Sequence, residues 1–597
     1  MRFARLSAAL VVALCVALPA QARHHAPPKP HNVLIFVADG LRYVSVTPQT
    51  APTMWKLKTQ GVDFTNSHSL YPTITTVNAS AIATGHYIGD TGNFGNTLYT
   101  GYPVAGTNGA PITFQEDDTL LGALAAHFGG NYLNETSLIA AAREAGYATA
   151  VMGKVGPTAI QDITQRDGTG TIVIDDAMNT PKGITVAPEI NDAIKAAGLP
   201  LTAPKTNVPN NEQQQYMIAV ATKVVLPKLA SSTKPFAMLF WSRDPDASQH
   251  SQKDSLGKLT PGINGPTGQA GIKDADDTLA ALLAALKAQG LDKTTDVFVT
   301  ADHGFSTIDR HSQTSIAAKL TFGRVPPGET PPGIVAIDLA DALAMPMYDP
   351  FQLNKPVDYR NGELPSYGNA ILGADPANPD VVVVANGGSD HIYLPGANAR
   401  DLAAKIADVL SREDYISGIF VNDNLGSVAG ALPLSAVNLH GAALTPQPSM
   451  IVSFASHVVP GCKPVLMCAA EMADTTLETG QGMHGTFSRS DTRNFMAATG
   501  PDFKARFADP APVSNADINP TLAHILRLDI PAKGSLKGRV ASEALKGGKK
   551  VTVTKGWQAS MPAANGQRTI LEYQRVGGTR YFDAAGFPGR TVGLSPH

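Results

Sequence analysis

Continuous apolar runs constrain the fold of this chain more than any other feature of its sequence. The runs occupy residues 32–40, 236–241, 296–304, 381–385 and 449–455. Runs without polar alternation are typical of strands in a sheet that is covered on both faces. Helical patterns at 134–148, with Asn134 or Thr136 as its N-cap, and at 274–290 lie between some of the runs. Strands that alternate with helices predict an α/β sandwich.

The first 22 residues have the pattern of a signal peptide. Arg2 and Arg5 precede an apolar stretch at 6–20, and Ala20-Gln21-Ala22 supplies small residues for cleavage. We therefore expect export, so that the mature protein is periplasmic or secreted. No other segment reaches the roughly 20 apolar residues of a membrane helix, and we expect no membrane span after cleavage.

The charge balance excludes one class of partner. Removal of Arg2 and Arg5 with the signal peptide would change the formal net charge from −3 to −5, with 45 basic and 50 acidic residues remaining. Non-specific nucleic-acid binding needs a basic surface, so the sequence predicts no nucleic-acid-binding surface. At 43% hydrophobic and 16% charged residues, the 597-residue chain has the composition of a large globular enzyme or binding protein.

Two cysteines, Cys462 and Cys468, remain in the predicted mature chain. In an oxidising compartment nearby cysteines are expected to pair, so we predict a disulfide that closes the loop between them. Their spacing does not match a redox C-x-x-C motif.

Shifts in composition indicate a core interrupted by insertions. Residues 31–310 are predicted as the first part of the core, and 311–447, which contain Pro-, Asn- and Asp-rich stretches, as an insertion or cap. Residues 448–547 are predicted to complete the core. The tail at 548–597 is predicted to be a small β appendage, with a hairpin formed by TILEYQR and TRYFDAAG.

Acidic residues and histidines follow three of the apolar runs. They are Asp39, the pair Asp246 and His250, and the pair Asp302 and His303. Ligands bind at the carboxyl ends of strands in open α/β sheets, and mixed oxygen and nitrogen donors suit zinc or a neighbouring transition metal. One such residue alone is more often a cap or a turn residue. Their joint occurrence predicts a metal centre.

A hydroxyl-rich segment, residues 71–87, follows the first run. Thr75 or Thr76 is expected to begin a helix, where backbone N–H groups and the helix dipole favour an anion such as a phosphoryl group. A threonine at this position is also an ordinary helix cap. Lys154 follows another predicted strand and could contact substrate, or equally be a solvated strand-end lysine.

Taken in order, six motifs resemble the alkaline phosphatase superfamily, and within it the type I phosphodiesterase/nucleotide pyrophosphatase branch. They are ADG at 38–40, PTIT at 72–75, TG at 84–85, DPDASQH at 244–250, TADHG at 300–304 and GMHG at 482–485. The resemblance covers roughly residues 32–530. It implies an alkaline-phosphatase-like fold, with a central, mostly parallel sheet flanked by helices and loop-rich insertions.

The resemblance also implies two metal ions, expected to be Zn²⁺ or other divalent transition metals. One would be held by Asp246, His250 and His484. The other would be held by Asp39, Asp302 and His303, with the hydroxyl of Thr75 as a further ligand. Thr75 corresponds to the nucleophile of the family, and Asn96 to its phosphoryl-binding asparagine. Residues 76–79 read TVNA, where the family usually has Phe-Pro-Asn-His.

A two-metal phosphohydrolase is the function that the resemblance implies. It would cleave phosphodiester or pyrophosphate bonds of a small molecule through a phosphothreonine intermediate. A monoesterase and a phosphonate hydrolase are the alternatives. A sulfatase would need a C/S-x-P-x-R context around its nucleophile, which Thr75 lacks. An exported binding protein without activity is disfavoured because every implied metal ligand is present.

Overall fold

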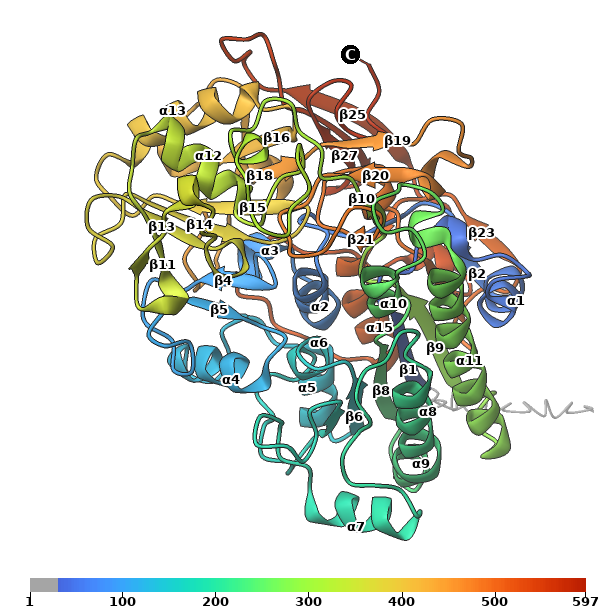
Figure 1. The fold of residues 1–597 in the computed structure, drawn as a ribbon. Helices are drawn as coiled ribbons and strands as arrows, with labels where there is room; N and C mark the ends of the chain where they lie inside the picture. Colours follow the sequence, from blue (N-terminus) through green and yellow to red (C-terminus); the bar gives the residue numbers. More distant parts are fainter. Residues whose placement is uncertain (1–29, 597) are drawn as a thin grey trace, which may run out of the picture.

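An eight-stranded sheet forms the centre of the core in the computed structural model, which describes residues 30–596 (Figure 1). The parallel strands lie side by side in the order β9 (Thr295–Thr300), β1 (Asn32–Ala38), β8 (Phe236–Ser242), β6 (Ala148–Gly153) and β7 (Ile172–Asp175). β22 (Met496–Thr499) joins β9 in antiparallel orientation, followed by β2 (Val62–Phe64) and β23 (Phe507–Asp509).

Both faces of this sheet are covered, as the apolar run of β1 requires. Val33, Ile35 and Val37 pack on one side against α2 (Thr75–Thr84), α5 (Leu138–Glu144) and α15 (Ile518–Leu526). The alternate residues pack on the other side against α1 (Pro52–Gln60), α8 (Asn211–Val220) and α11 (Pro266–Ala288). The predicted α/β fold with a mostly parallel central sheet is confirmed.

Two helix starts differ from the prediction. α5 is capped by Ser137, whose hydroxyl accepts a hydrogen bond from Ala140 N at 3.1 Å, so Asn134 and Thr136 are not its caps. Asn134 instead has a left-handed backbone (φ +61°), unlike the extended conformation of an N-cap. α11 begins at Pro266, before the predicted 274, because proline fits the first helical position.

The insertion contains an eight-stranded sheet of its own. It includes β14 (Val381–Ala385), β15 (Ser389–Tyr393), β16 (Ile416–Val421) and β18 (Met450–Phe454). The two apolar runs at 381–385 and 449–455 are therefore buried strands of this second sheet, and the start of β18 at Met450 moves the insertion past the predicted boundary at 447. A run buried on both faces reveals its burial but not the sheet to which it belongs.

The other strands of this sheet extend it at both ends. They are β12 (Lys355–Pro356), β11 (Met347–Asp349), β13 (Ala370–Leu372) and β17 (Ala431–Pro433). Helices α12 (Ile334–Ala342) and α13 (Ala399–Arg412) share an apolar core with the sheet. Most of the strand pairs are antiparallel, unlike those of the central sheet.

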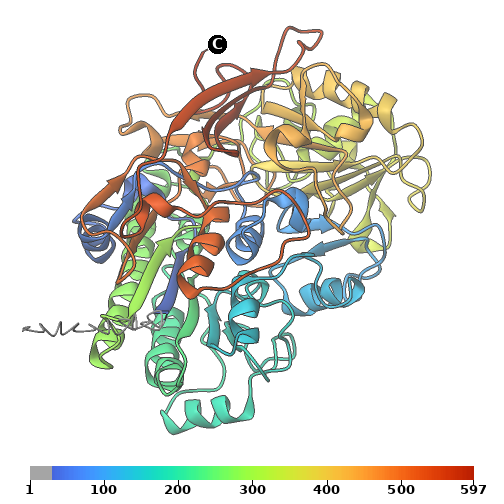
Figure 2. The ribbon, with the colours of Figure 1, turned by 180° about the vertical axis from the view of Figure 1, so that it is seen from behind.

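A three-stranded antiparallel sheet ends the chain and connects the core with the insertion (Figure 2). Its strands are β25 (Val553–Ala559), β26 (Ile570–Val576) and β27 (Thr579–Gly586). Asp583 contacts His68 of the core at 2.8 Å, and the Thr569 hydroxyl accepts a hydrogen bond from Ile419 N of the insertion at 3.1 Å. The appendage thereby stabilises the position of the insertion.

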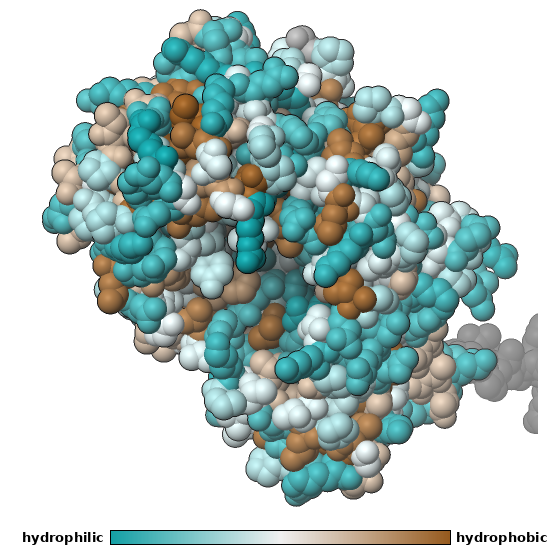
Figure 3. Space-filling model, viewed as in Figure 1, coloured by the Kyte–Doolittle hydropathy of each residue, from teal (hydrophilic) through white to brown (hydrophobic). Residues whose placement is uncertain are grey.

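The insertion lies against loops near the carboxyl ends of the parallel strands. Gly388 N donates to the carbonyl of His484 at 2.9 Å, and Asn386 accepts from Thr97 N at 2.9 Å. Figure 3 shows the surface hollowed between insertion and core. Within the described residues, no helix is both long and apolar enough to cross a membrane. The predicted signal peptide, residues 1–22, lies outside the described residues.

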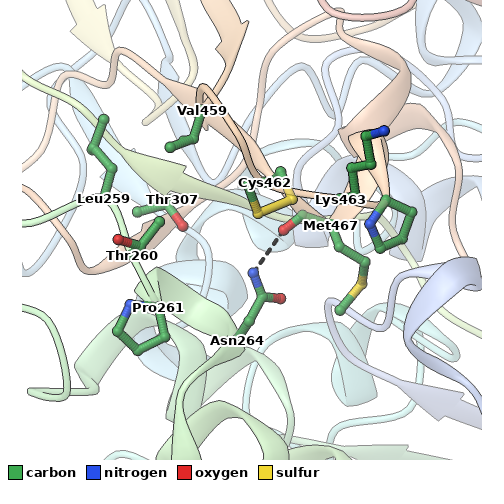
Figure 4. A pocket seen from close by; sticks show the side chains of 11 residues that line it. Leu259, Thr260, Pro261, Asn264, Thr307, Val459, Cys462, Lys463 and Met467 are labelled. Atoms are coloured by element: carbon green, nitrogen blue, oxygen red, sulfur yellow. Dashed lines mark hydrogen bonds between the residues drawn. A yellow bond between two sulfur atoms is a disulfide. The ribbon is translucent and has the colours of Figure 1, made fainter.

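Cys462 and Cys468 form a disulfide in the loop that precedes β20 (Ala469–Glu471). The bond lines a pocket of about 290 Å³ (Figure 4), in which Asn264 donates to the carbonyl of Met467 at 2.7 Å. The residues that line this pocket include none of the predicted metal ligands or catalytic residues.

We expect exported protein to begin at Arg23 and to contain one disulfide. Intact-mass measurement checks the first expectation, and alkylation of thiols before and after reduction checks the second. Mature protein should take up two alkyl groups only after reduction, since Cys15 leaves with the signal peptide. Two reactive thiols in unreduced protein would contradict the disulfide, and retention of residues 1–22 would contradict cleavage.

Candidate two-metal phosphohydrolase site

The predicted ligands meet because their strands are neighbours. Asp39 follows β1, Asp246 opens α10 (Asp246–Ser251) after β8, and Asp302 follows β9. β9, β1 and β8 are adjacent and parallel, so their carboxyl ends lie at one edge of the sheet. His484 joins them from far along the chain because it follows β21 (Gly482–Met483), which pairs with β10 (Ser306–Ile308) just beyond Asp302.

The three histidines of the cluster are oriented alike. Nδ1 of His250, His303 and His484 lies 2.8 Å from the carbonyls of Gly482, Gly304 and Thr73, respectively. A carbonyl can only accept a hydrogen bond, so each Nδ1 carries the proton and each neutral ring has its lone pair on Nε2. Backbone partners of this kind orient metal-binding histidines.

The Nε2 atoms face carboxylate oxygens at distances that suit shared metal ligation. His303 Nε2 lies 3.2 Å from Asp302 Oδ2 and 3.6 Å from Asp39 Oδ1. Ligands about 2.0–2.1 Å from a tetrahedral zinc are about 3.3 Å from each other. The donor atoms of Asp39, Asp302 and His303 lie within 4.8 Å of one another, which agrees with the second predicted ligand set.

Around Asp246 the grouping differs slightly from the predicted one. Asp246 Oδ1 lies 3.2 Å from Nε2 of His250 and 3.6 Å from Nε2 of His484. His303 also belongs to this group, because its donor atom lies within 4.8 Å of those of Asp246 and His484. The rings of His303 and His484 stack with centroids 3.5 Å apart. His303 is therefore placed between the two predicted metal positions.

One oxygen of each carboxylate is engaged by the protein and the other is not. Asp302 Oδ1 accepts from Gly40 N at 3.0 Å, whereas Asp39 Oδ2 accepts from Trp241 Nε1 at 2.8 Å and from Lys154. Asp39 Oδ1, Asp246 Oδ1 and Asp302 Oδ2 are buried and accept no hydrogen bond from any described residue. Three such oxygens beside three unprotonated Nε2 atoms fit two divalent cations.

The protonation tendencies of the cluster show its need for positive charge. Burial and the Asp246 carboxylate raise the pKa of Asp39, and burial with the Asp39 carboxylate raises the pKa of Asp302. Burial lowers the pKa of His303 to about 3 and holds the pKa of His484 well below its usual range. Divalent cations would stabilise ionised carboxylates and neutral imidazoles together.

Thr75 is the threonine whose hydroxyl contacts this cluster. It is the first residue of α2, as predicted, and its Oγ1 lies 3.2 Å from His303 Nε2. The hydroxyl of Thr76 instead donates to the Gly95 carbonyl at 3.0 Å. Asn96 is close by, because its Oδ1 accepts from Thr76 N at 3.0 Å. The structure thus places Thr75 and Asn96 together at the N-terminus of α2.

Lys154 is a second charged component of the site. Its side chain is only 3% exposed, and its Nζ lies 2.9 Å from Asp39 Oδ2, 3.4 Å from Asp246 Oδ2 and 3.0 Å from Glu116 Oε1. The alternative of a solvated strand-end lysine is therefore wrong. Burial opposes its charge, but the carboxylates of Asp246, Asp39 and Glu116 hold the pKa of Lys154 well above its usual value.

Glu116 and Trp241 are site residues that the sequence analysis missed. Glu116 follows the short strand β5 (Ile112–Phe114) and no recognisable motif, although it lies 3.5 Å from Asn96 Nδ2. Trp241 lies within the apolar run of β8, where its indole resembles any other core residue. The position of Lys154 directly after β6 was the one available signal, since strand ends are where ligands bind.

The site opens on one side. Side chains of Thr75, Asp39 and Asp302 are fully or almost fully buried, whereas those of His250 and Glu116 are 19% and 14% exposed. Asn96 is half-buried. A substrate would therefore approach past Glu116, Asn96 and His250.

Comparison with known proteins agrees with this geometry. No curated protein matches the chain in sequence. Among solved structures, murine ectonucleotide pyrophosphatase/phosphodiesterase 5, in an inactive form in complex with AMP, has 13% identity and a TM-score of 0.48, covering 86% of this chain and 100% of that one. Another structure of the same murine protein has 14% identity and a TM-score of 0.46, covering 84% and 97%. The sequence model of type I phosphodiesterase/nucleotide pyrophosphatase matches residues 33–394, and the chain belongs to this family of hydrolases.

Proposed function

We propose that this chain is an exported two-metal hydrolase that cleaves phosphodiester or pyrophosphate bonds through a phosphothreonine at Thr75. The observation that carries the proposal is the contact of Thr75 Oγ1 with His303 Nε2 at 3.2 Å, at a helix N-terminus beside the Asp/His cluster. Membership of the family supports the reaction class. Cleavage of the signal peptide, expected from residues 1–22, supports export.

The six Asp and His residues of the cluster would hold two divalent ions, Zn²⁺ by the chemistry of their donors. His303 is near enough to serve either position. When bound, such ions lower the pKa of a coordinated hydroxyl and stabilise negative charge on phosphoryl oxygens. Lys154 keeps Oδ2 of Asp39 and Asp246 engaged, which leaves Oδ1 of each available as a ligand.

Thr75 is positioned to attack phosphorus. Its Oγ1 would form the bond to phosphorus while the bond to the leaving oxygen breaks, and attack by water on the phosphothreonine would release Thr75. The N-terminal dipole of α2 favours the negative charge of the phosphoryl group. Asn96 Nδ2 is the neutral donor closest to this position, and hydrogen bonds aimed at a phosphoryl oxygen stabilise the transition state.

Cationic side chains near the site are already paired with other groups. Lys154 is held by three carboxylates, and Arg243 Nε donates to Asp176 at 2.8 Å. Arg489 is directed elsewhere, because it donates to the carbonyl of Ser67 at 3.1 Å. The second negative charge of a phosphomonoester would have no dedicated cationic partner among these residues, whereas a diester carries a single charge.

An aryl phosphodiester should therefore be hydrolysed with at least about a tenfold higher kcat/KM than the corresponding aryl monoester, which corresponds to the loss of one charge-assisted hydrogen bond. Initial rates on 4-nitrophenyl phosphate and bis(4-nitrophenyl) phosphate, measured with the zinc-loaded mature enzyme, check this. A clear preference for the monoester would instead make the protein a phosphatase.

A further inference from the structure

A pocket of about 640 Å³ lies between the core and the insertion. The core contributes the hairpin of β4 (Thr97–Tyr99) and β5, and the start of α4 (Asp118–His127). The insertion contributes the segment from Phe351 to Asn369. In Figure 1, β4 and β5 lie beside the strands of the insertion, in agreement with the contacts between β4 and β14. The volume is that of a small-molecule site.

The pocket is continuous in sequence with the candidate site. Thr97, which lines it, directly follows Asn96, and Phe114 is the partner of Thr97 across the hairpin. Glu116, two residues beyond Phe114, contacts both Asn96 and Lys154. Two extended residues span at most about 7 Å, so a group attached to a phosphoryl unit at Asn96 can reach the pocket.

The walls of the pocket present aromatic faces to solvent. Phe114 from the core is 42% exposed and Tyr367 from the insertion is 73% exposed, which is unusual for side chains of this kind. Phe351 packs edge-on against Tyr367, with ring centroids 5.9 Å apart at 89°. A flat organic group that stacks on such rings gains both apolar burial and ring–ring attraction.

The position of Tyr367 is set by its neighbours. Its backbone is left-handed (φ +56°), which is unfavourable for a bulky residue. The preceding Ser366 donates from its backbone N at 3.0 Å and its hydroxyl at 2.7 Å to the buried Asp349. Because these bonds hold the turn, the exposed ring is presented toward the pocket before any ligand binds.

The charge of the pocket favours an uncharged occupant. Asp117 is its one charged lining residue, and its carboxylate caps α4 and lies 3.5 Å from Lys182. No lysine or arginine is among the residues that line it. A second phosphate, as in a pyrophosphate, would meet the carboxylate of Asp117 without a compensating cation in the lining.

We propose that this pocket binds the organic group that remains attached to phosphorus, and that Phe114 and Tyr367 select a flat, uncharged group there. In an in-line displacement the leaving oxygen departs opposite Thr75, whereas the retained group projects sideways, as does the phosphoryl oxygen that Asn96 would bind. The substrate class is then a phosphodiester with an aromatic retained group. This inference rests on the proposed function and specifies its substrate.

Three diesters with one leaving group test the inference. Methyl, phenyl and 4-carboxyphenyl esters of 4-nitrophenyl phosphate all release 4-nitrophenolate and differ only in the retained group. We expect kcat/KM for the phenyl ester to exceed that for the methyl ester by at least about tenfold, the range of one well-filled apolar contact. The additional carboxylate should remove most of this advantage.

Variants assign the effect to the pocket. In Phe114→Ala/Tyr367→Ala, and more weakly in Tyr367→Ala alone, the phenyl-to-methyl ratio should fall at least about fivefold. Leu353→Ala is the matched control, because Leu353 lies in the same insertion, is 80% exposed and also has φ +56°, yet does not line the pocket. Its ratio should equal that of the parent.

The outcomes separate the two proposals. An unchanged ratio in the double and single variants, or a parent ratio near 1, would overturn the assignment of the pocket even where turnover depends on Thr75. Turnover that persists in Thr75→Ala would instead overturn the proposed function.

Discussion

Replacing Thr75 with alanine should lower kcat for an aryl diester by at least about 1,000-fold, as removal of a covalent nucleophile does in other hydrolases. The fold should be retained, because the Thr75 side chain has one polar contact, to His303. Metal content should stay near that of the parent, since the Asp and His ligands are unchanged. Quenching the parent enzyme during turnover should trap phosphate on Thr75, identifiable by peptide mass spectrometry.

Thr76→Ala is the matched control for this prediction. Thr76 is the next residue of α2 and equally buried, but its hydroxyl bonds to the Gly95 carbonyl and not to the cluster. We expect this variant to lose less than about tenfold in kcat, the effect of one structural hydrogen bond. If Thr76→Ala abolishes activity while Thr75→Ala retains it, the nucleophile is Thr76 and the register is shifted by one residue.

Removing the metal ions should abolish turnover reversibly. We expect the purified protein to carry about two divalent ions per chain, because three buried carboxylate oxygens and three Nε2 atoms converge without other partners among the described residues. Chelation followed by dialysis should leave negligible activity, and added Zn²⁺ should restore it. Elemental analysis and rate measurements on the same samples check both parts.

Single-ligand variants refine the assignment. Asp302→Asn and His484→Ala should each lose about one ion per chain. His457→Ala is the control, since His457 is 47% exposed on the side chain and lies outside the cluster. It should retain the metal content of the parent. Unchanged metal content in both ligand variants would reject the proposed ligand sets, and a metal-free parent with full activity would reject the two-metal proposal.

The core sheet and the location of the site were predictable from local patterns. The runs that became β1, β8 and β9 are apolar throughout, and such runs exclude an exposed strand. The acids that follow them could be grouped because parallel neighbours end at one edge of a sheet. Thr75 could be placed at a helix start because small and apolar residues follow it at helical spacing.

The grouping within the second sheet was not predictable in the same way. The runs of β14 and β18 have the same composition as those of the core, but their hydrogen-bond partners are β13, β15 and β16. Strand pairing is decided by contacts between distant segments. An apolar run specifies that a strand is buried and leaves its partners undetermined.

The sequence by itself determined the donor set, because the identities of Asp39, Asp302 and His303 and their places after strands follow from local patterns. Tertiary structure decided which atoms those residues offer. Lys154 and Trp241 occupy Oδ2 of Asp39, and a backbone carbonyl protonates Nδ1 of His303. These contacts join segments more than 100 residues apart, or depend on the ring orientation that packing imposes, and no local pattern encodes either. Direction and burial of each donor, not its identity, were therefore the contribution of the fold.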